Sequence, residues 1–388
     1  MSINIDQAKQ QFKDHFKFDA ELAVRAPGRV NIIGEHTDYN HGYVMPMALE
    51  RETVILARKR TDNTLNAFAA TLGRTAEAGL DRRVRNPREP WLDYVIGVAD
   101  ELAKLGKPLS GADLMITGDV PIGCGLSSSA SLEMAALAMF EALGGFNLDG
   151  PDAARLGQRV ENQFLGLNSG IMDQFISRMA KSGHALFLDC RTFEFELVPV
   201  AFPDATFVIA NTCLARGLTS SKYNERVAEC RQAVAILSKA LQRGATHLRD
   251  FTLAELSASH ALMPGNVYRR ARHVISENDR TIRACETMGR GDAPALGELM
   301  TDSDRSLRED YEVTSPELDA MTRAALAIPG CYGARMTGAG FGGCTINLVV
   351  RDAADEFSQR LLPEYFDQTG HQGAIVTSSP AQGASRLF

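Results

Sequence analysis

The segment from Arg25 to Pro46, which reads RAPGRVNIIGEHTDYNHGYVMP, constrains this chain more than any other part of its sequence. It places Glu35, His36 and Asp38 close together directly after an apolar run. In a buried strand, so many hydrogen-bonding groups without partners would cost much free energy. A solvated loop would not need the apolar neighbours. The pattern therefore predicts a strand that delivers a rigid polar loop to a site for a hydroxyl-rich ligand.

The composition is that of an ordinary globular protein and argues against some classes of function. The chain has 388 residues, of which 45% are hydrophobic and 23% charged, and this length favours two domains of about 100–200 residues each. The formal net charge is -7. Because we find no basic excess or stripe, we expect no nucleic-acid partner. No apolar run approaches the roughly 18 residues of a membrane span, so we expect no membrane partner.

The cysteines and the N-terminal residues indicate the compartment. The seven cysteines are widely spread and include no C-x-x-C pair, which indicates neither a disulfide framework nor a zinc site. The first residues, MSINIDQAKQQFKDHF, contain no apolar signal-peptide core. We therefore expect a cytoplasmic protein in a reducing environment.

Hydrophobic periodicity predicts helices and strands in both halves of the chain. The expected helices are 4–18, Trp91–Leu105, Ser129–Leu143, Asp152–Leu165, Gly170–Met179, Ser221–Leu241, Val267–Met288, Ala293–Arg308, Pro316–Ala327 and one near the end. The expected strands are Leu22–Val24, Arg29–Ile33, Tyr43–Met47, Thr53–Arg58, Asp113–Thr117, His184–Asp189, Phe193–Val198, Thr206–Ala210, two that flank Gly338–Gly343, and a last one. Because the pattern restarts near Pro203, we predict two α+β domains, residues 1–203 and residues 204–388.

The segment Asp119–Ser131, DVPIGCGLSSSAS, has the features of a phosphate-binding loop. Gly123 and Gly125 allow a tight turn and close approach of the backbone to a ligand. The serines that follow begin a strong helix, whose N-terminus offers unpaired N–H groups and a partial positive charge. A plain helix cap needs one serine rather than Gly-x-Gly-x-Ser-Ser-Ser. The G-x-x-x-x-G-K-[ST] string of P-loop enzymes is missing, so the predicted anion cradle works without a lysine.

A second glycine-rich stretch, MTGAGFGGC from Met336 to Cys344, formally matches G-x-G-x-x-G. A dinucleotide-binding motif of this form must be followed by a helix. The residues that follow, Thr345–Val350, are strand-like. We therefore interpret the stretch as a turn between two strands that presses against a neighbouring loop or ligand.

Two carboxylates complete the set of groups that a phosphoryl transfer requires. Glu161 lies on a predicted helix, and Asp173 follows Gly170 among apolar neighbours. A carboxylate in such surroundings needs a partner, and an arginine would serve. Phosphoryl transfer calls for a phosphate cradle, oxygen ligands for Mg²⁺, a group at the acceptor hydroxyl and a cation for the developing charge.

Four segments in this order resemble the successive signatures of galactokinases within the GHMP small-molecule kinase superfamily: RAPGRVNIIGEHTDYN, PIGCGLSSSAS, GIMDQF and RMTGAGFGGC. SSKYNERVAEC (Ser220–Cys230) and HVISENDRT (His273–Thr281) are also similar to galactokinases. The resemblance covers nearly the whole chain. It implies a two-domain α+β fold, with an N-terminal part like domain 2 of ribosomal protein S5, a ferredoxin-like C-terminal part, and the active site between them.

The resemblance also implies the activity: ATP-dependent phosphorylation of galactose at the anomeric hydroxyl, which gives galactose 1-phosphate and ADP. This reaction is the first committed step of galactose catabolism in the Leloir pathway. By the same resemblance, Asp173 accepts or polarises the proton of that hydroxyl, as a general base or as an electrostatic and orienting group. Arg29 orients Asp173, keeps it ionised and stabilises the transferring phosphoryl group.

The remaining site residues are carried over in the same way. Those implied to bind the sugar are Glu35, His36, Asp38 and Tyr223. Those implied to bind ATP are Gly123, Cys124, Gly125, Leu126, Ser127, Ser128 and Ser129, with Trp91 and Tyr94 on the adenine side. Ser129 and Glu161 are implied to ligate Mg²⁺, with Ser128 as the alternative to Ser129. We expect a monomer or a weak homo-oligomer.

The chain departs from the family pattern at His41, Ala339, Val227 and Leu214–Leu218. The last two departures lie near Tyr223, in the region that bears on sugar selectivity. Two other functions therefore stay open. One is a related GHMP kinase for an N-acetylated or uronic sugar. The other is a non-catalytic sensor of galactose and ATP, although such a sensor should have lost catalytic groups that this chain retains.

Overall fold

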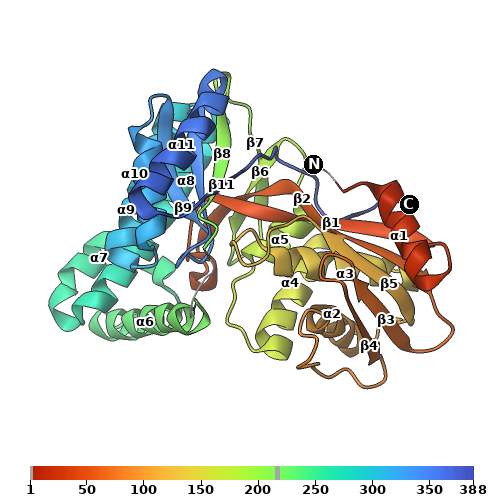
Figure 1. The fold of residues 1–388 in the computed structure, drawn as a ribbon. Helices are drawn as coiled ribbons and strands as arrows, with labels where there is room; N and C mark the ends of the chain where they lie inside the picture. Colours follow the sequence, from red (N-terminus) through yellow and green to blue (C-terminus); the bar gives the residue numbers. More distant parts are fainter. Residues whose placement is uncertain (1–2, 215–218) are drawn as a thin grey trace.

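The computed structural model describes residues 3–214 and 219–388, which form two β-sheets covered by helices (Figure 1). In the first, eight-stranded sheet, the order is β12-β1-β2-β5-β3-β4, and β6 and β7 are attached through β2. Its strands are β1 (Leu22–Ile33), β2 (Tyr43–Lys59), β3 (Thr64–Ala69), β4 (Arg74–Gly79), β5 (Ala112–Gly118), β6 (His184–Asp189), β7 (Phe195–Pro199) and β12 (Ser385–Arg386).

The two faces of the first sheet pack against different helices, because successive side chains of a strand point to opposite faces. In β2, Ile55 and Ala57 join the core under α2, α3 and α4, whereas Val54 and Leu56 face α1. The helices around this sheet are α1 (Ile5–Phe16), α2 (Asp93–Lys104), α3 (Ser128–Gly144), α4 (Gly150–Arg159) and α5 (Met172–Met179).

Helix α3 is central to this half of the molecule, since it contacts β1, β2, α2, α4 and α5. Its sequence is rich in alanine, leucine and methionine, which are strong helix formers. The helix ends where Gly145 adopts the left-handed conformation, with φ of 67°, as is typical of a C-terminal cap. Its buried position fixes where its N-terminus opens.

The second sheet has four strands in the order β11-β8-β10-β9. They are β8 (Ala205–Asn211), β9 (Cys331–Thr337), β10 (Cys344–Val350) and β11 (Ala374–Val376). On one face, Val208 and Val349 pack against α10 (Pro316–Ala327) and α11 (Ala354–Thr369). On the other face, Ile209 and Ile346 pack against α8 (Gly265–Gly289) and α9 (Ala293–Ser306).

Strand β1 joins the two halves of the molecule. Its residues Val30 and Ile32 belong to the same buried core as Ile346 of the second sheet. A further core lies between α6 (Thr219–Ala240), α7 (Leu253–Ala258), α8 and the π-helix η5 (Leu307–Tyr311). Tyr39, from the short helix η1 (Asp38–Asn40) between β1 and β2, packs against this helical core. The loop after β1 is therefore held from both halves.

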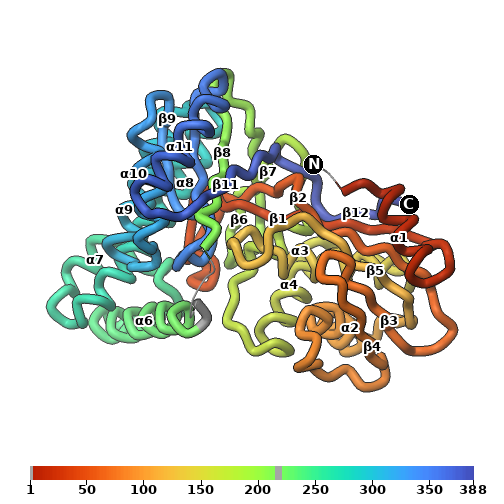
Figure 2. Tube along the Cα trace, in the orientation of Figure 1, coloured from red at the N-terminus to blue at the C-terminus, as the bar shows by residue number. Residues whose placement is uncertain are grey.

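The C-terminal segment returns from the second sheet to the first (Figure 2), where β12 pairs antiparallel with β1. The predicted division into residues 1–203 and 204–388 stays a prediction. Among the described residues, no helix is both long enough and apolar enough to cross a membrane.

The predicted α+β class is confirmed by these sheets and helices. Two pairs of predicted strands are single long strands, β1 and β2. The register shifts between Pro27 and Arg29, where residues 49–51 of β2 lie opposite Gly28, but the pairing continues on both sides. The predicted helix Asp152–Leu165 is α-helical only to Arg159 and continues as the π-helix η2 (Val160–Leu165). The hairpin of β3 and β4 and the helix α7 were not predicted from the sequence. The departure noted at Leu214–Leu218 lies largely outside the described residues.

Candidate active site

Arg29 and Asp173 form a two-point ion pair, although 144 positions separate them in the chain. Arg29 Nε donates to Asp173 Oδ1 and Nη2 donates to Oδ2, both over 2.8 Å. Arg29 lies on β1 and is only 4% exposed, while Asp173 lies in the first turn of α5. A hydrogen bond from Ser127 Oγ also reaches Asp173 Oδ2. The arginine partner that the sequence required for Asp173 is thus Arg29, and charge-assisted bonds of this kind fix its orientation.

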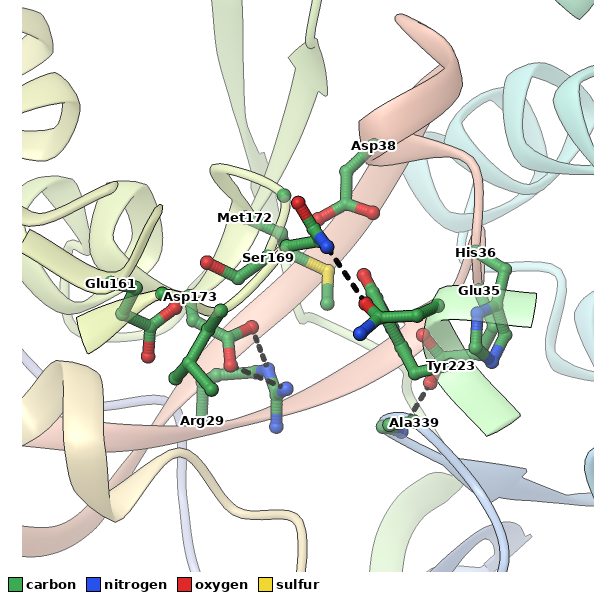
Figure 3. A pocket seen from close by; sticks show the side chains of 16 residues that line it. Arg29, Glu35, His36, Asp38, Glu161, Ser169, Met172, Asp173, Tyr223 and Ala339 are labelled. Carbon is green, nitrogen blue, oxygen red and sulfur yellow. Dashed lines mark hydrogen bonds and ion pairs between the residues drawn. The ribbon is translucent and has the colours of Figure 1, made fainter. Parts of the chain in front are cut away.

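A cavity of about 510 Å³ opens above this ion pair (Figure 3). Its lining includes all the residues that were expected to bind the sugar or to take part in catalysis, and Glu161, the carboxylate expected to ligate Mg²⁺. These are Arg29, Glu35, His36, Asp38, Glu161, Asp173 and Tyr223. Residues from both halves of the molecule contribute, since Tyr223 comes from α6 and Gly338 and Ala339 come from the turn after β9.

Asp38 owes its position to Gly170. A Cβ atom on Gly170 would lie 1.7 Å from Asp38 Oδ2, so the carboxylate reaches its place only because no side chain stands there. Burial, together with the nearby charge of Asp173, raises the pKa of Asp38 to about 7. Asp38 and Asp173 therefore face one cavity in different electrostatic settings.

Glu35 is bound on both carboxylate oxygens. Asn31 Nδ2 donates to Oε2 over 2.6 Å and the Gly338 backbone N–H donates to Oε1 over 2.5 Å. Arg335, which is fully buried, lies 3.6 Å from Oε1. Burial raises the pKa of Glu35, and the charge of Arg335 opposes that rise. The glycine-rich turn after β9 thus presses against the polar loop through a backbone amide, as its sequence predicted.

His36 has a left-handed backbone, with φ of 63°, and is 5% exposed. Its Nδ1 is 2.9 Å from the Tyr39 hydroxyl, whereas Nε2 is buried without a hydrogen-bond partner in the described chain. Burial, reinforced by the neighbouring His273, lowers the pKa of His36 to about 3. His36 is therefore neutral in the working range of most enzymes.

Helix α8 supplies residues whose role the sequence did not reveal. Glu277 Oε1 accepts from the backbone N–H of Gly34 over 3.0 Å, and Asn278 Oδ1 accepts from that of Tyr43 over 3.0 Å. His273 Nε2 lies 3.1 Å from the carbonyl oxygen of Glu35. These residues belong to the HVISENDRT string, which marked the family without a physical role; in the structure they hold the backbone of the polar loop.

The serine-rich loop turns beside β1 and opens into α3. Gly123 and Gly125 have φ of 78° and 79°, values that favour glycine. A Cβ on Gly28 would lie 2.6 Å from the Leu126 carbonyl oxygen, so this glycine lets the loop approach β1. The first turn of α3 carries no acidic residue, and the Ser127 side chain does not cap it. The N-terminus of this helix is thus open to an anion.

A second cavity of about 520 Å³ lies on the other side of this loop. Its lining is largely apolar and includes Trp91, Tyr94, Ile122, Ser128, Ser129 and Leu132. Ser129 also donates a hydrogen bond to Glu161, which lines the first cavity. The two cavities therefore meet at Ser129 and Glu161, next to the N-terminus of α3.

The residues at this junction fit a divalent cation. Burial raises the pKa of Glu161 and, more strongly, that of Glu133 beside it. Glu133 Oε1 and Gln174 Oε1 are buried without partners among the described residues. Oxygen donors of this kind suit Mg²⁺, which binds one or two carboxylates and completes its shell with phosphate oxygens and water. In the described ranges no group of three or more His, Cys, Asp or Glu forms a self-sufficient metal site.

Family models match three parts of the chain. Residues 10–59 match the galactokinase galactose-binding signature, residues 93–181 the N-terminal domain of GHMP kinases, and residues 282–368 the C-terminal domain of GHMP kinases.

Whole-length relatives agree with these matches. A galactokinase of Roseiflexus sp. (strain RS-1) is 41% identical over 389 residues, which is 100% of this chain and 98% of the relative. One of Chloroflexus aurantiacus is 42% identical over 97% of this chain and 96% of its own length. The crystal structure of Lactococcus lactis galactokinase complexed with galactose has a TM-score of 0.94 and 37% identity, covering 99% of this chain and 100% of that one. The chain therefore belongs to the galactokinase family of the GHMP kinases.

Proposed function

We propose that this enzyme transfers the γ-phosphoryl group of ATP to the anomeric hydroxyl of galactose, giving galactose 1-phosphate and ADP. One observation carries the proposal: the Arg29–Asp173 ion pair lies between the polar cavity and the open N-terminus of α3. The sugar-binding signature matches the loop that lines the same cavity.

In this proposal Asp173 accepts a hydrogen bond, and finally the proton, from the anomeric hydroxyl. Arg29 keeps the carboxylate turned toward that hydroxyl, and its guanidinium faces the negative charge on the transferring group. A loose transition state needs little activation of the nucleophile. Positioning of Asp173 by Arg29 and Ser127 therefore contributes at least as much to the rate as the basicity of Asp173 does.

The sugar is held by groups of complementary character. Asp38 and Glu35 accept hydrogen bonds from sugar hydroxyls, and His36 and Tyr223 close the cavity around them. The proximity of Asp38 to Gly170 leaves little room on that side. This favours galactose over sugars that carry an N-acetyl group.

The nucleotide lies across the junction of the two cavities. Its base occupies the apolar cavity beside Trp91 and Tyr94, and its phosphates meet the backbone of Gly123–Ser129. Ser129 and Glu161 would hold Mg²⁺, with Ser128 as the alternative to Ser129, and the bound ion would neutralise phosphate charge. We also propose that the chain has two domains, residues 1–203 and residues 204–388. We propose that the protein is a monomer or a weak homo-oligomer.

The test is ADP release from the purified protein, measured with ATP, Mg²⁺ and a panel of sugars: galactose, glucose, N-acetylgalactosamine and galacturonate. We expect turnover with galactose to exceed that with the other sugars by a wide margin. Equal or better turnover of an N-acetylated or uronic sugar would assign the chain to another substrate. Binding of galactose and ATP without turnover would identify a sensor instead.

A further inference from the structure

A chain of three hydrogen bonds runs from the sugar cavity into the core, and the proposed reaction does not use it. His36 Nδ1 is 2.9 Å from the hydroxyl of Tyr39, which is 2.7 Å from the hydroxyl of Tyr311. The Tyr311 hydroxyl is in turn 3.2 Å from Cys230 Sγ. The members come from η1, η5 and α6 and from the loop before η1. Both halves of the molecule thus contribute to one hydrogen-bonded chain.

Three of these four groups are buried and Tyr39 is half-buried, so most of their hydrogen-bonding capacity must be satisfied within the chain. Tyr311 is 0% exposed, Cys230 is 3% exposed and His36 is 5% exposed. The ring centroids of His36 and Tyr311 are 4.8 Å apart, and those of Tyr311 and His273 are 4.5 Å apart. Close packing of this kind keeps the hydroxyls in fixed positions.

Each hydroxyl has a single proton, so the chain can be ordered in only two directions. In one order the protons point toward His36, and Tyr39 donates to Nδ1. In the other order Nδ1–H donates to Tyr39, and Tyr311 donates to the sulfur of Cys230. A phenol is a stronger acid than a neutral imidazole N–H, and a thiol is a weak acceptor. Both facts favour the order that points toward His36.

The other end of the chain supports the same order. Asn40 Nδ2 already donates to Cys230 Sγ over 3.7 Å, so the thiol proton is free to be donated to Tyr311. When Tyr311 donates to Tyr39, the proton of Tyr39 must turn to the remaining acceptor, which is Nδ1. The proton of the imidazole is then on Nε2. Nε2 has no side-chain or backbone partner within hydrogen-bond geometry in the described chain, and the backbone of Ala339, which also lines the cavity, interacts with the same ring.

We propose that Tyr39 and Tyr311 are positioning residues that hold neutral His36 as its Nε2–H tautomer, so that His36 donates a hydrogen bond to a hydroxyl oxygen of the sugar. The proposal rests on the proposed function, and it deepens the sugar specificity of that site. When ionised, the neighbouring carboxylate of Asp38 can only accept hydrogen bonds. A sugar hydroxyl that donates to a carboxylate and accepts from His36 Nε2–H uses both its donor and its acceptor capacity.

This arrangement discriminates between epimers. A sugar whose hydroxyl points elsewhere leaves a buried N–H donor unpaired, and rejection by an unpaired polar group exceeds rejection by apolar contact. The C-terminal half of the chain thus affects sugar choice through Tyr311, which is distant from the signature loop in sequence but contacts Tyr39 and His36 in the structure.

The direct test is the tautomer of His36 in the wild-type protein. Histidine labelled with ¹⁵N in the ring gives distinct long-range ¹H–¹⁵N patterns for the Nε2–H and Nδ1–H forms, and the signals missing from His36→Gln assign the ring. We expect Nε2–H before and after galactose is added. An Nδ1–H tautomer in the wild type overturns the proposal, and this measurement does not depend on the folding of any tyrosine variant.

The kinetic test uses Tyr39→Phe and Tyr311→Phe, with Tyr365→Phe as the matched control. Tyr365 is as buried as Tyr311, and its hydroxyl donates to the backbone carbonyl of Thr212 in another part of the molecule. We expect the KM for galactose to rise about tenfold in Tyr39→Phe and about threefold in Tyr311→Phe, with kcat within about twofold, since one neutral hydrogen bond is involved. The preference for galactose over glucose should fall more in Tyr39→Phe than in Tyr311→Phe.

The ring signals of His36 should show mixed tautomers in Tyr311→Phe and remain unchanged in Tyr365→Phe. A Tyr311→Phe protein that matches Tyr365→Phe in both tautomer and KM contradicts the proposal. Failure of the proposed function has a different signature: no ADP release with galactose from a wild-type protein whose spectrum shows Nε2–H, an outcome that still supports the hydrogen-bonded chain.

Discussion

At the scale of single residues, the acids of this site differ because their partners differ. Asp173 is held by two bonds from Arg29 and one from Ser127. Asp38 faces Asp173 and forms no ion pair with an arginine of the described residues, and burial together with the charge of Asp173 raises the pKa of Asp38 to about 7. In the proposed function, environment rather than residue type distinguishes the carboxylate at the reacting hydroxyl from the one that binds the sugar.

Replacing Asp173 by asparagine keeps the shape of the side chain but removes its charge and its capacity to take a proton. We expect kcat to fall by at least about 100-fold, the lower range for the loss of a proton acceptor, while nucleotide affinity changes little. Steady-state ADP release and nucleotide titration measure the two effects. Asp189→Asn is the matched control, because Asp189 pairs with Arg249 away from the cavity. A near-wild-type kcat for Asp173→Asn would refute the role of Asp173.

Replacing Asp38 by asparagine should change the pH dependence of stability. The pKa of Asp38 is about 7 in the folded protein against an ordinary value of 3.8, so the folded state binds more protons than the unfolded state between these values. The free energy of unfolding therefore falls as pH rises from about 4 to about 7. Above pH 7 Asp38 is ionised in both states, and the full cost of burying its charge is present. We expect Asp38→Asn to raise Tm relative to wild type at pH 8 and much less at pH 4. Equal differences at the two pH values would contradict this expectation.

At the scale of elements, the polar loop depends on a helix that is distant in sequence. Glu277 of α8 is 0% exposed and accepts from Gly34 N–H, Ser303 Oγ and Arg280 Nε. Burial would raise its pKa, but Arg280, His273 and Arg335 outweigh burial and lower the pKa to about 2. Gly34, with φ of 95°, turns the chain after β1, and its backbone N–H is bound by Glu277.

Glu277→Ala should therefore lower both stability and sugar affinity. Removing one partner of a buried ion pair costs about 3–5 kcal/mol, so urea unfolding should show a loss of that order. The KM for galactose should rise, because the Gly34 turn that leads into the Glu35–His36 segment loses its anchor. Glu286→Ala, at an exposed position of the same helix, is the control. If both variants had the same stability, α8 would not be the support of the loop.

At the scale of the whole molecule, the two sheets share a buried core. Val30 and Ile32 of the first sheet pack with Ile346 and Leu348 of the second, and β12 brings the C-terminal residues back to β1. The cavity lies between the halves and takes residues from both. Motion of one half against the other would have to open this core.

We therefore expect one calorimetric unfolding transition, although chains of this length often unfold in steps. Galactose should raise the temperature of that single transition, since a ligand that binds only the folded state adds RT ln(1 + [L]/Kd) of stability. Ile346→Ala should lower it, and no second transition should separate. Two resolved transitions, with galactose shifting only one of them, would show that the halves unfold independently.

The amino-acid sequence by itself determined the chemistry of the site. The order of residues placed glycines and serines where α3 begins and carboxylates after apolar runs, and these local patterns act within a few residues. They were sufficient for the helix at Ser128–Gly144, the α+β class and the polar residues Glu35, His36, Asp38 and Asp173 that line the cavity, whereas Tyr223 was implied only by the family resemblance.

Only the tertiary structure decided how those residues act. The support of the loop by Glu277, the link from His36 to Tyr311 and the π-helical turn that carries Glu161 depend on contacts between distant segments. The raised pKa of Asp38 and the lowered pKa of His36 arise from burial. No local pattern encodes these contacts, because burial and long-range hydrogen bonds exist only once both halves of the chain have packed around β1.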